Sequence, residues 1–326
     1  MHVIVGAGTI GSTTARLLAE AGEHVRIVTR SGGGPEHHNI ERVAADAGDA
    51  PTLRDLSRGA TALYNCANPP YHTWPTDWPP LAASLLGAAE ASGAVLAITG
   101  NLYGYGPVDQ PMTEGMPLAA PTVKGRVRVR MWQDALAAHR AGRVRVTEVR
   151  ASDFIGPKQS LLEMALPGLR AGKTVWLPSP LDIPHSFTFT GDVARMLVLA
   201  AADERAWGRA WHVPSPEPVT LRELVRRAAA VGGFAEPTIR RYPEPVVRAA
   251  ALFDPFTRAF LEMAYQFKRP FVLDSTRATA TFGLRHTELD DALRASIRAA
   301  QPAAAKAGRR SAGGVDTDAQ PTDRPP

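Results

Sequence analysis

Three glycines near the start of the chain have the spacing of a phosphate-binding turn. Gly6, Gly8 and Gly11 form a G-x-G-x-x-G pattern between an apolar run and an amphipathic run, in "MHVIVGAGTIGSTTARLLAEAGEHV". Glycines at these places permit a tight turn, a close approach of the backbone to a pyrophosphate, and close packing of a helix on a strand. The helix that follows would point its first backbone N–H groups at the phosphates. The pattern predicts a dinucleotide site formed by Gly6, Gly8, Thr9, Ile10 and Gly11.

The end of the next apolar run indicates which dinucleotide binds. An acidic residue there would accept hydrogen bonds from the adenosine ribose hydroxyls of NAD, but the chain has Thr29, Arg30 and Ser31. A cation and hydroxyl groups suit the 2′-phosphate of NADP. We therefore expect NADP, with Arg30 and Ser31 at its phosphate, and keep NAD as the alternative, in which Arg30 only faces solvent.

These glycines belong to a regular alternation of short apolar runs with amphipathic ones. Such alternation is typical of an α/β fold, and we predict a Rossmann-like, doubly wound parallel sheet over residues 1–150. A smaller C-terminal substrate-binding part with interleaved elements is expected over residues 151–300. The segment 301–326 is rich in small, polar and proline residues, which predicts a disordered tail. The apolar runs lie near residues 2–5, 25–28, 41–44, 61–65, 94–98 and 144–149, and later helices near 160–171, 191–202, 220–231, 244–264 and 288–299.

Composition excludes several classes of protein. No apolar run approaches the roughly 20 residues that a membrane span needs, so we expect no membrane partner. The net charge of +5 comes from basic residues scattered among acidic ones, which argues against nucleic acid. One cysteine and a start without secretory features predict a cytoplasmic protein. His37 and His38 have no ligand cluster around them, so we predict no metal site.

Several further motifs occur along the chain in the order that a known family has them. Through these motifs, residues 1 to about 300 resemble the NAD-dependent epimerase/dehydratase family, the extended branch of the short-chain dehydrogenases/reductases. The resemblance implies that Asp46 meets the adenine, that Ala67 lines the cofactor, and that Thr99 contacts the reacting oxygen. One departure marks a divergent branch, because Val5 replaces the first glycine of the family's G-x-x-G-x-x-G, with Gly6 next to it. The motifs are "VAADAGD", "LYNCAN", "AITGNLYGYG", "VRASDFIGP", "HSFTFTGDVARML" and "FVLDSTRATATFGLRHTELDDAL".

The same resemblance indicates where a substrate binds. Asn101 follows Thr99 at the end of a strand, Asp153 follows the next strand, and His185 stands in the segment that closes the pocket. We expect these three residues at a small-molecule substrate. The segment "NPPYHTWPTDWPP" is expected to be a loop whose aromatic residues form a substrate lid or pack against the body. Homodimers are common among such relatives, so a homodimer is possible.

The family's catalytic motif is missing. Members usually carry Tyr-x-x-x-Lys at the start of the helix after the fifth strand, and the phenol gives or takes a proton as hydride moves. In "PTVKGRVRVRMWQ" the two positions hold Lys124 and Arg128, and none of the six tyrosines of the chain has a lysine four residues later.

Three interpretations remain open. Lys124 and Arg128 share a helical face, where the guanidinium could lower the pKa of the lysine and make it a proton donor. Alternatively, the phenol of Tyr103 or Tyr105 acts from the neighbouring turn. In the third interpretation the protein is an inactive NADP-binding sensor or scaffold, in which the basic residues form a solvated face opposite a buried stripe. That face is Lys124, Arg126, Arg128 and Arg130, and that stripe is Val129, Trp132 and Leu136.

We expect an enzyme. The predicted reaction is hydride transfer at a carbonyl or alcohol carbon of a small polar molecule, by an NADP-linked oxidoreductase or epimerase. Sugar nucleotides are the commonest substrates of the family that the chain resembles, although nothing in residues 151–300 identifies a nucleotide pocket. The predicted catalytic residues are Thr99, Lys124, Arg128 and Tyr103.

Overall fold

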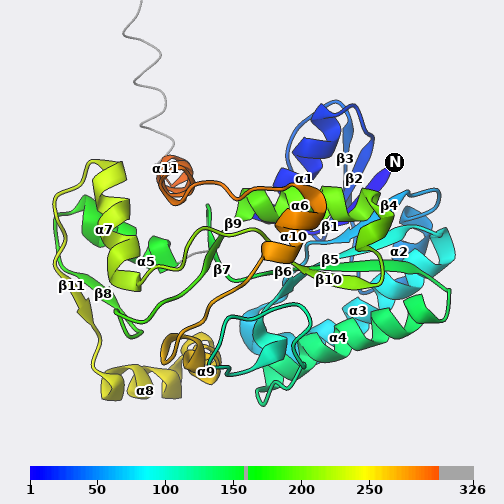
Figure 1. The fold of residues 1–326 in the computed structure, drawn as a ribbon. Helices are drawn as coiled ribbons and strands as arrows, with labels where there is room; N and C mark the ends of the chain where they lie inside the picture. The colour runs from blue at the N-terminus through cyan, green and yellow to red at the C-terminus, as the bar shows by residue number, and fades with distance from the viewer. Residues whose placement is uncertain (158–160, 301–326) are drawn as a thin grey trace, which may run out of the picture.

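A seven-stranded parallel sheet forms the centre of the molecule (Figure 1). The computed structural model describes residues 1–157 and 161–300, so the predicted tail lies outside the described residues. Strand order is β10-β6-β5-β4-β1-β2-β3. Because β1 pairs with both β2 and β4, the strand order reverses between β1 and β4, and such a point is where open α/β sheets bind ligands. The strands are β1 (His2–Val5), β2 (Val25–Thr29), β3 (Ile40–Ala44), β4 (Ala62–Asn65), β5 (Val95–Asn101), β6 (Arg145–Ala151) and β10 (Arg209–His212).

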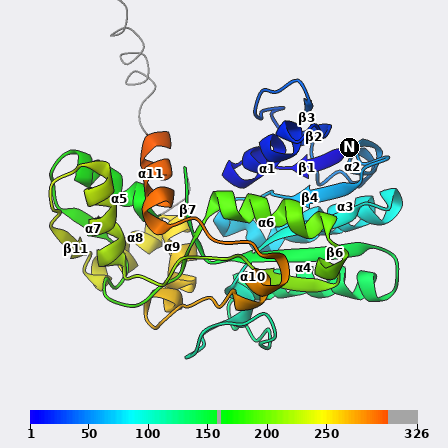
Figure 2. The same cartoon turned by 45° about the horizontal axis from the view of Figure 1, so that its top comes forward.

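Helices cover both faces of this sheet (Figure 2). One face carries α1 (Thr9–Glu20), α6 (Thr190–Ala202) and α10 (Thr276–Phe282). The other face carries α2 (Ala50–Leu56), α3 (Trp74–Ser92) and α4 (Val123–Arg140). The predicted doubly wound, Rossmann-like α/β fold is confirmed.

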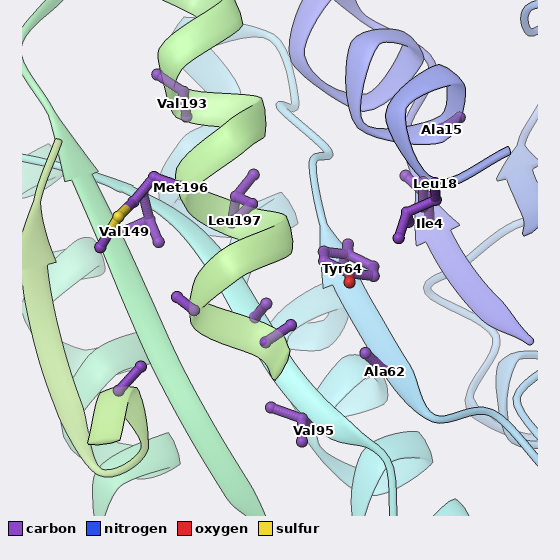
Figure 3. Packing of buried hydrophobic residues seen from close by; sticks show 14 of the residues in the cluster. Ile4, Ala15, Leu18, Ala62, Tyr64, Val95, Val149, Val193, Met196 and Leu197 are labelled. Atoms are coloured by element: carbon purple, nitrogen blue, oxygen red, sulfur yellow. The ribbon is translucent and has the colours of Figure 1, made fainter. Parts of the chain in front are cut away.

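Alternate strand residues enter two separate cores. Ile4 packs into the core beneath α1 and α6, whereas Val3 and Val5 pack into the core beneath α3 and α4. Figure 3 shows Met196 of α6 beside Val149 of β6 on the first of these faces. Both faces of each central strand are thus buried, which explains why the strands read as continuous apolar runs.

The remaining elements form a lobe beside the sheet, on the left in Figure 1. Its core joins α5 (Leu161–Arg170), α7 (Leu221–Gly232) and α11 (Leu289–Ala299). Two short parallel pairs accompany it, β7 (Asp153–Ile155) with β9 (Phe187–Phe189), and β8 (Val175–Leu177) with β11 (Ile239–Arg241). Among the helices that the structure describes, none combines the length and apolar character needed to span a bilayer.

Two sequence predictions about elements were wrong. The single helix predicted over 244–264 is two helices, α8 (Glu244–Phe253) and α9 (Pro255–Glu262). The break occurs because the Asp254 carboxylate accepts the backbone N–H of Thr257 and caps a new helix that begins at Pro255. The expected loop over 68–80 becomes helical at Trp74, where α3 begins after a short 3₁₀ turn over Tyr71–Thr73.

Candidate active site

The carboxyl ends of the central strands open into a cavity of about 1830 Å³. The turn after β1 and the ends of β2, β4 and β5 line one part of it. The lobe lines the other part, through residues of α5, α8 and α9. The cavity therefore has room for a dinucleotide and a substrate side by side.

Each of the three glycines helps in a different way to form a turn that can bind a pyrophosphate. Gly6 has φ +102°, and a Cβ there would lie 2.6 Å from the carbonyl oxygen of Cys66. A Cβ on Gly11 would lie 2.0 Å from the carbonyl oxygen of Gly6, so Gly11 lets α1 pack on the turn without itself lining the cavity. Gly8 lines the cavity, and no atom lies within 4 Å of the place of its Cβ. Gly8 also caps α1 without a side-chain hydrogen bond, which leaves this helix end open to an anion.

The other predicted cofactor residues line the same part of the cavity. Arg30 and Ser31 are exposed at the end of β2. The Asp46 carboxylate accepts the backbone N–H of Gly48 at 2.8 Å, and Ala67 follows β4. The hydroxyl of Thr9 donates to the carbonyl oxygen of Pro157 at 2.6 Å, which connects the start of α1 to the segment after β7. The cavity lining on this side comprises Gly6, Gly8, Thr9, Ile10, Arg30, Ser31, Asp46 and Ala67.

The end of β5 contributes polar groups to the middle of the cavity. Thr99, Asn101 and Tyr103 all line it. The Asn101 side-chain oxygen accepts the backbone N–H of Tyr103 at 3.2 Å. The Tyr71 hydroxyl donates to the Tyr103 hydroxyl at 3.3 Å. Burial, with a smaller contribution from the Asp153 carboxylate, raises the pKa of Tyr103 to about 12, so this phenol stays protonated at neutral pH.

Arg128 is a buried cation in the cavity wall. Its guanidinium carbon lies 4.7 Å from the Trp74 ring and 4.5 Å from the Trp78 ring, and one of its nitrogens donates to the carbonyl oxygen of Thr99 at 3.1 Å. Burial lowers the pKa of Arg128 to about 10, against the opposing effect of the Glu148 carboxylate. In the described ranges no carboxylate forms an ion pair with Arg128, and its Nε has no hydrogen-bond partner. A charged group without a counter-ion is therefore available to a ligand.

Lys124 does not line the cavity. Its Nζ lies 2.6 Å from Oε2 of Glu262, and its backbone N–H donates to Oε1 of the same carboxylate at 2.9 Å. Its Nζ also lies 4.7 Å from the centre of the Tyr71 ring. Burial raises the pKa of Glu262, but the hydrogen bonds from Lys124 outweigh that effect and leave this pKa below its ordinary value. Lys124 thus connects α4 to α9.

The buried face of α4 corrects one sequence interpretation. The predicted solvated face contained four basic residues. Arg126 and Arg130 are exposed, as that interpretation expects, but Lys124 and Arg128 are buried, so it is wrong for these two residues. The tryptophans of α3 and the carboxylate of α9 cover this face, so the two cations are desolvated. Of the predicted stripe, Trp132 is buried, while Val129 and Leu136 are only half-buried.

Asp153 and His185 occupy different positions with respect to the cavity. Asp153 lines it, whereas His185 is buried behind it. The His185 ring stacks on Phe267, with ring centres 4.7 Å apart and an angle of 6° between the planes. Its Nε2 lies 3.0 Å from Oδ2 of Asp153, although the ring orientation does not satisfy hydrogen-bond geometry. The structure thus places Asp153, but not the His185 ring, where a substrate could touch it.

Comparison with known proteins identifies the family. The model of the NAD dependent epimerase/dehydratase family matches residues 2–213. The chain belongs to this family. No curated protein sequence matches it.

Solved structures with the same fold include three sugar-nucleotide enzymes, all under 25% identical to the chain. The dTDP-glucose 4,6-dehydratase of Streptomyces venezuelae has a TM-score of 0.74 and 20% identity, covering 91% of this chain and 96% of that one. The UDP-glucose 4-epimerase of Thermotoga maritima has a TM-score of 0.76 and 15% identity, covering 92% and 98%. The UDP-glucuronic acid 4-epimerase of Bacillus cereus has a TM-score of 0.74 and 15% identity, covering 92% and 98%.

The chain lacks the Tyr-x-x-x-Lys that members of this family usually carry. Lys124, which the sequence motif aligns with the usual tyrosine, is ion-paired outside the cavity, and Arg128, which it aligns with the usual lysine, lines the cavity. Tyr105 offers no substitute phenol, because it does not line the cavity and its hydroxyl lies 2.7 Å from Arg150 and 2.8 Å from His212. Tyr103 and Tyr71 are the tyrosines that line the cavity near Arg128.

Sequence reasoning missed the contribution of the segment 244–271. Phe256, Phe260, Met263 and Gln266 line the cavity, yet they stand more than 100 residues after Arg128. The amphipathic pattern of this segment predicts helix, but nothing in it shows which element its apolar face covers. In the segment expected to form a lid or to pack against the body, Tyr71 and Trp74 both line the cavity, and Trp74 is also buried against the body.

Proposed function

We propose that this protein is an NADP-linked oxidoreductase that transfers hydride at a carbonyl or alcohol carbon of a small molecule. The observation that carries the proposal is one continuous cavity with a glycine turn and Arg30 in one part and Arg128, Tyr103 and Asp153 in the other. The Streptomyces dehydratase, which shares the fold, was solved with NAD bound. That supports a nicotinamide cofactor, and Arg30 with Ser31 favours the phosphorylated form.

Residues of the chain would supply the proton and stabilise the charges of the reaction. The nicotinamide cofactor, when bound, supplies or accepts the hydride. Tyr103 donates the proton to the carbonyl oxygen, because its phenol lines the cavity and is protonated at neutral pH. The Tyr71 hydroxyl, which donates to Tyr103, stabilises the phenolate that results. Arg128 provides positive charge beside the same oxygen or beside the cofactor ribose.

This assignment prefers Tyr103 to Lys124 as the proton donor. The ammonium of Lys124 is already bound by the Glu262 carboxylate, and Lys124 does not line the cavity where a substrate oxygen would lie. At neutral pH the Tyr103 phenol is protonated, which is the form that carbonyl reduction requires, whereas alcohol oxidation requires the phenolate. The site therefore favours carbonyl reduction over alcohol oxidation near neutral pH.

The test is turnover of NADPH with a panel of aldehydes, ketones and sugar nucleotides. Oxidation of NADPH by at least one carbonyl compound, abolished by Tyr103→Phe with NADPH affinity retained, supports the proposal. Turnover that survives Tyr103→Phe but is lost in Lys124→Met would overturn the assignment of the acid.

A second candidate function is an NADP-binding protein without turnover, with a sensor or scaffold role. The observation that favours it is the loss of the family's Tyr-x-x-x-Lys together with the engagement of Lys124 by Glu262. NADPH binding with no carbonyl-dependent oxidation across the whole panel would favour this candidate over the enzyme.

A further inference from the structure

The part of the cavity that faces the lobe has an apolar opening. Among the exposed large apolar residues of the described chain, several ring this opening: Met164 is 50% exposed, Tyr242 39%, Val246 53% and Phe256 59%. They come from α5, α8, α9 and the segment before α8, and α8 and α9 lie at the lower edge of the molecule in Figure 1. Clusters of exposed apolar side chains around one opening are unusual in the absence of a binding function.

The part of the wall behind this opening that α8 and α9 form is uncharged, and the α5 part carries one carboxylate, Glu163. The residues of α8 and α9 that line the cavity are Val246, Val247, Ala250, Phe256, Thr257 and Phe260. A pyrophosphate placed against this wall would lose hydration without gaining a counter-charge from it, which is costly. An alkyl or aryl group would gain free energy in proportion to the area that it buries there.

A continuous aromatic path leads from the opening to the proposed proton donor. The ring centre of Phe256 lies 6.1 Å from that of Tyr71, and the Tyr71 hydroxyl contacts Tyr103. Deeper in the same wall, Phe260 stacks on Phe267 with ring centres 6.0 Å apart. A substrate with its oxygen at Tyr103 and Arg128 would therefore place the rest of its carbon skeleton along this wall.

From this geometry we infer that the substrate is an apolar carbonyl compound, an alkyl or aryl ketone or aldehyde, whose hydrocarbon part lies on α8 and α9. The inference rests on the proposed hydride transfer and narrows its substrate class away from sugar nucleotides. In the reduction, the carbonyl carbon receives hydride from NADPH and the oxygen receives a proton from Tyr103, giving the alcohol and NADP.

The test measures binding separately from turnover. The NADP-saturated protein is titrated calorimetrically with 2-butanone, 2-hexanone and 2-octanone, and separately with UDP-glucose. Affinity should rise about fourfold for each added methylene, the increase expected when a methylene is fully buried. UDP-glucose should bind more weakly than 2-octanone. Affinities that are independent of chain length, or tighter binding of UDP-glucose, would overturn the inference.

Two phenylalanines of the lobe provide a matched pair of variants. Phe256 lines the cavity, while Phe253 is 87% exposed and does not. Phe256→Ser should lower the affinity for 2-octanone by about tenfold and flatten the chain-length series, since one aromatic contact is lost. Phe253→Ser should leave both unchanged. Equal effects of the two variants would contradict the placement of the hydrocarbon part.

Titration with NADPH alone separates this inference from the proposed function. Chain-length-dependent ketone binding by a protein that fails to bind NADPH would sustain the apolar site and refute the hydride transfer. Tight NADPH binding together with ketone affinities that do not depend on chain length would support the cofactor site and refute the apolar substrate site.

Discussion

The Nζ of Lys124 lies 2.6 Å from Oε2 of Glu262, and this ion pair joins two helices that are separated by more than 100 residues of chain. Lys124 is buried, whereas the Glu262 side chain is 27% exposed. The residue that we predict at the place of the family's catalytic tyrosine thus has a structural partner, and the ion pair fixes α9 against the cavity.

Removing one member of this pair should destabilise the protein. Glu262→Gln leaves a buried ammonium without its carboxylate, and we expect the free energy of unfolding to fall by about 2 kcal/mol. The double variant Lys124→Met with Glu262→Met should recover part of this loss, because no buried charge remains. Urea denaturation measures both. A double variant less stable than Glu262→Gln would show that the pair itself, rather than the orphaned lysine, determines the loss.

Replacing Arg128 should weaken ligand binding without lowering the stability of the protein. Arg128→Met keeps the side chain between Trp74 and Trp78 but removes a desolvated charge without a counter-ion, so stability should stay equal or rise. Cofactor or substrate affinity should fall at least about tenfold, as for a lost charged contact. Thermal unfolding and NADPH titration test the two effects on the same sample. A large drop in stability with unchanged ligand binding would make Arg128 a structural residue only.

Tyr103→Phe should reduce kcat by at least about 100-fold, the typical contribution of a general acid, and leave the NADPH dissociation constant within about twofold. Tyr242→Phe is the control, because it removes a hydroxyl from another tyrosine that lines the cavity. Steady-state kinetics with the best carbonyl substrate measures the change. Similar rates in the two variants would exclude Tyr103 as the acid.

His212 should make the stability depend on pH. Burial, aided by the nearby Arg150 guanidinium, lowers the pKa of His212 to about 4. In the unfolded chain, histidine has its usual pKa of about 6.5. Between pH values of about 4 and about 6.5, the unfolded chain therefore binds more protons than the folded chain. The free energy of unfolding should fall by up to about 3 kcal/mol as pH decreases from 6.5 to 4. Urea denaturation at a series of pH values measures this slope, and His212→Gln should reduce it. An equal slope in that variant would assign the effect to other groups.

The sheet and the cofactor turn are local features, and so they could be predicted from sequence. Gly6, Gly8 and Gly11 act through the backbone of one strand, one turn and one helix, and the central predicted strands follow runs that are buried on both faces. The strand β10 escaped prediction because "RAWH" contains only two apolar residues, Ala210 and Trp211, and begins with an exposed arginine.

The substrate side could not be predicted, because it depends on contacts between distant segments. Lys124 and Arg128 have the same charge and lie on one helix, yet Glu262 engages one of them and Trp74 with Trp78 enclose the other. The position of His185 behind the cavity depends on Phe267 and Phe271, which stack on its ring. No local pattern shows which of these partners a side chain will meet.

The central claim is an NADP-linked site, and calorimetric titration of the protein with NADPH and NADH, beside the Arg30→Asp variant, tests it most directly. We predict that NADPH binds at least about tenfold more tightly than NADH, and that Arg30→Asp reverses this preference, because a carboxylate repels the 2′-phosphate and accepts hydrogen bonds from ribose hydroxyls. Equal affinities for the two cofactors, unchanged in the variant, would contradict the role of Arg30. Binding of neither would refute the cofactor site itself.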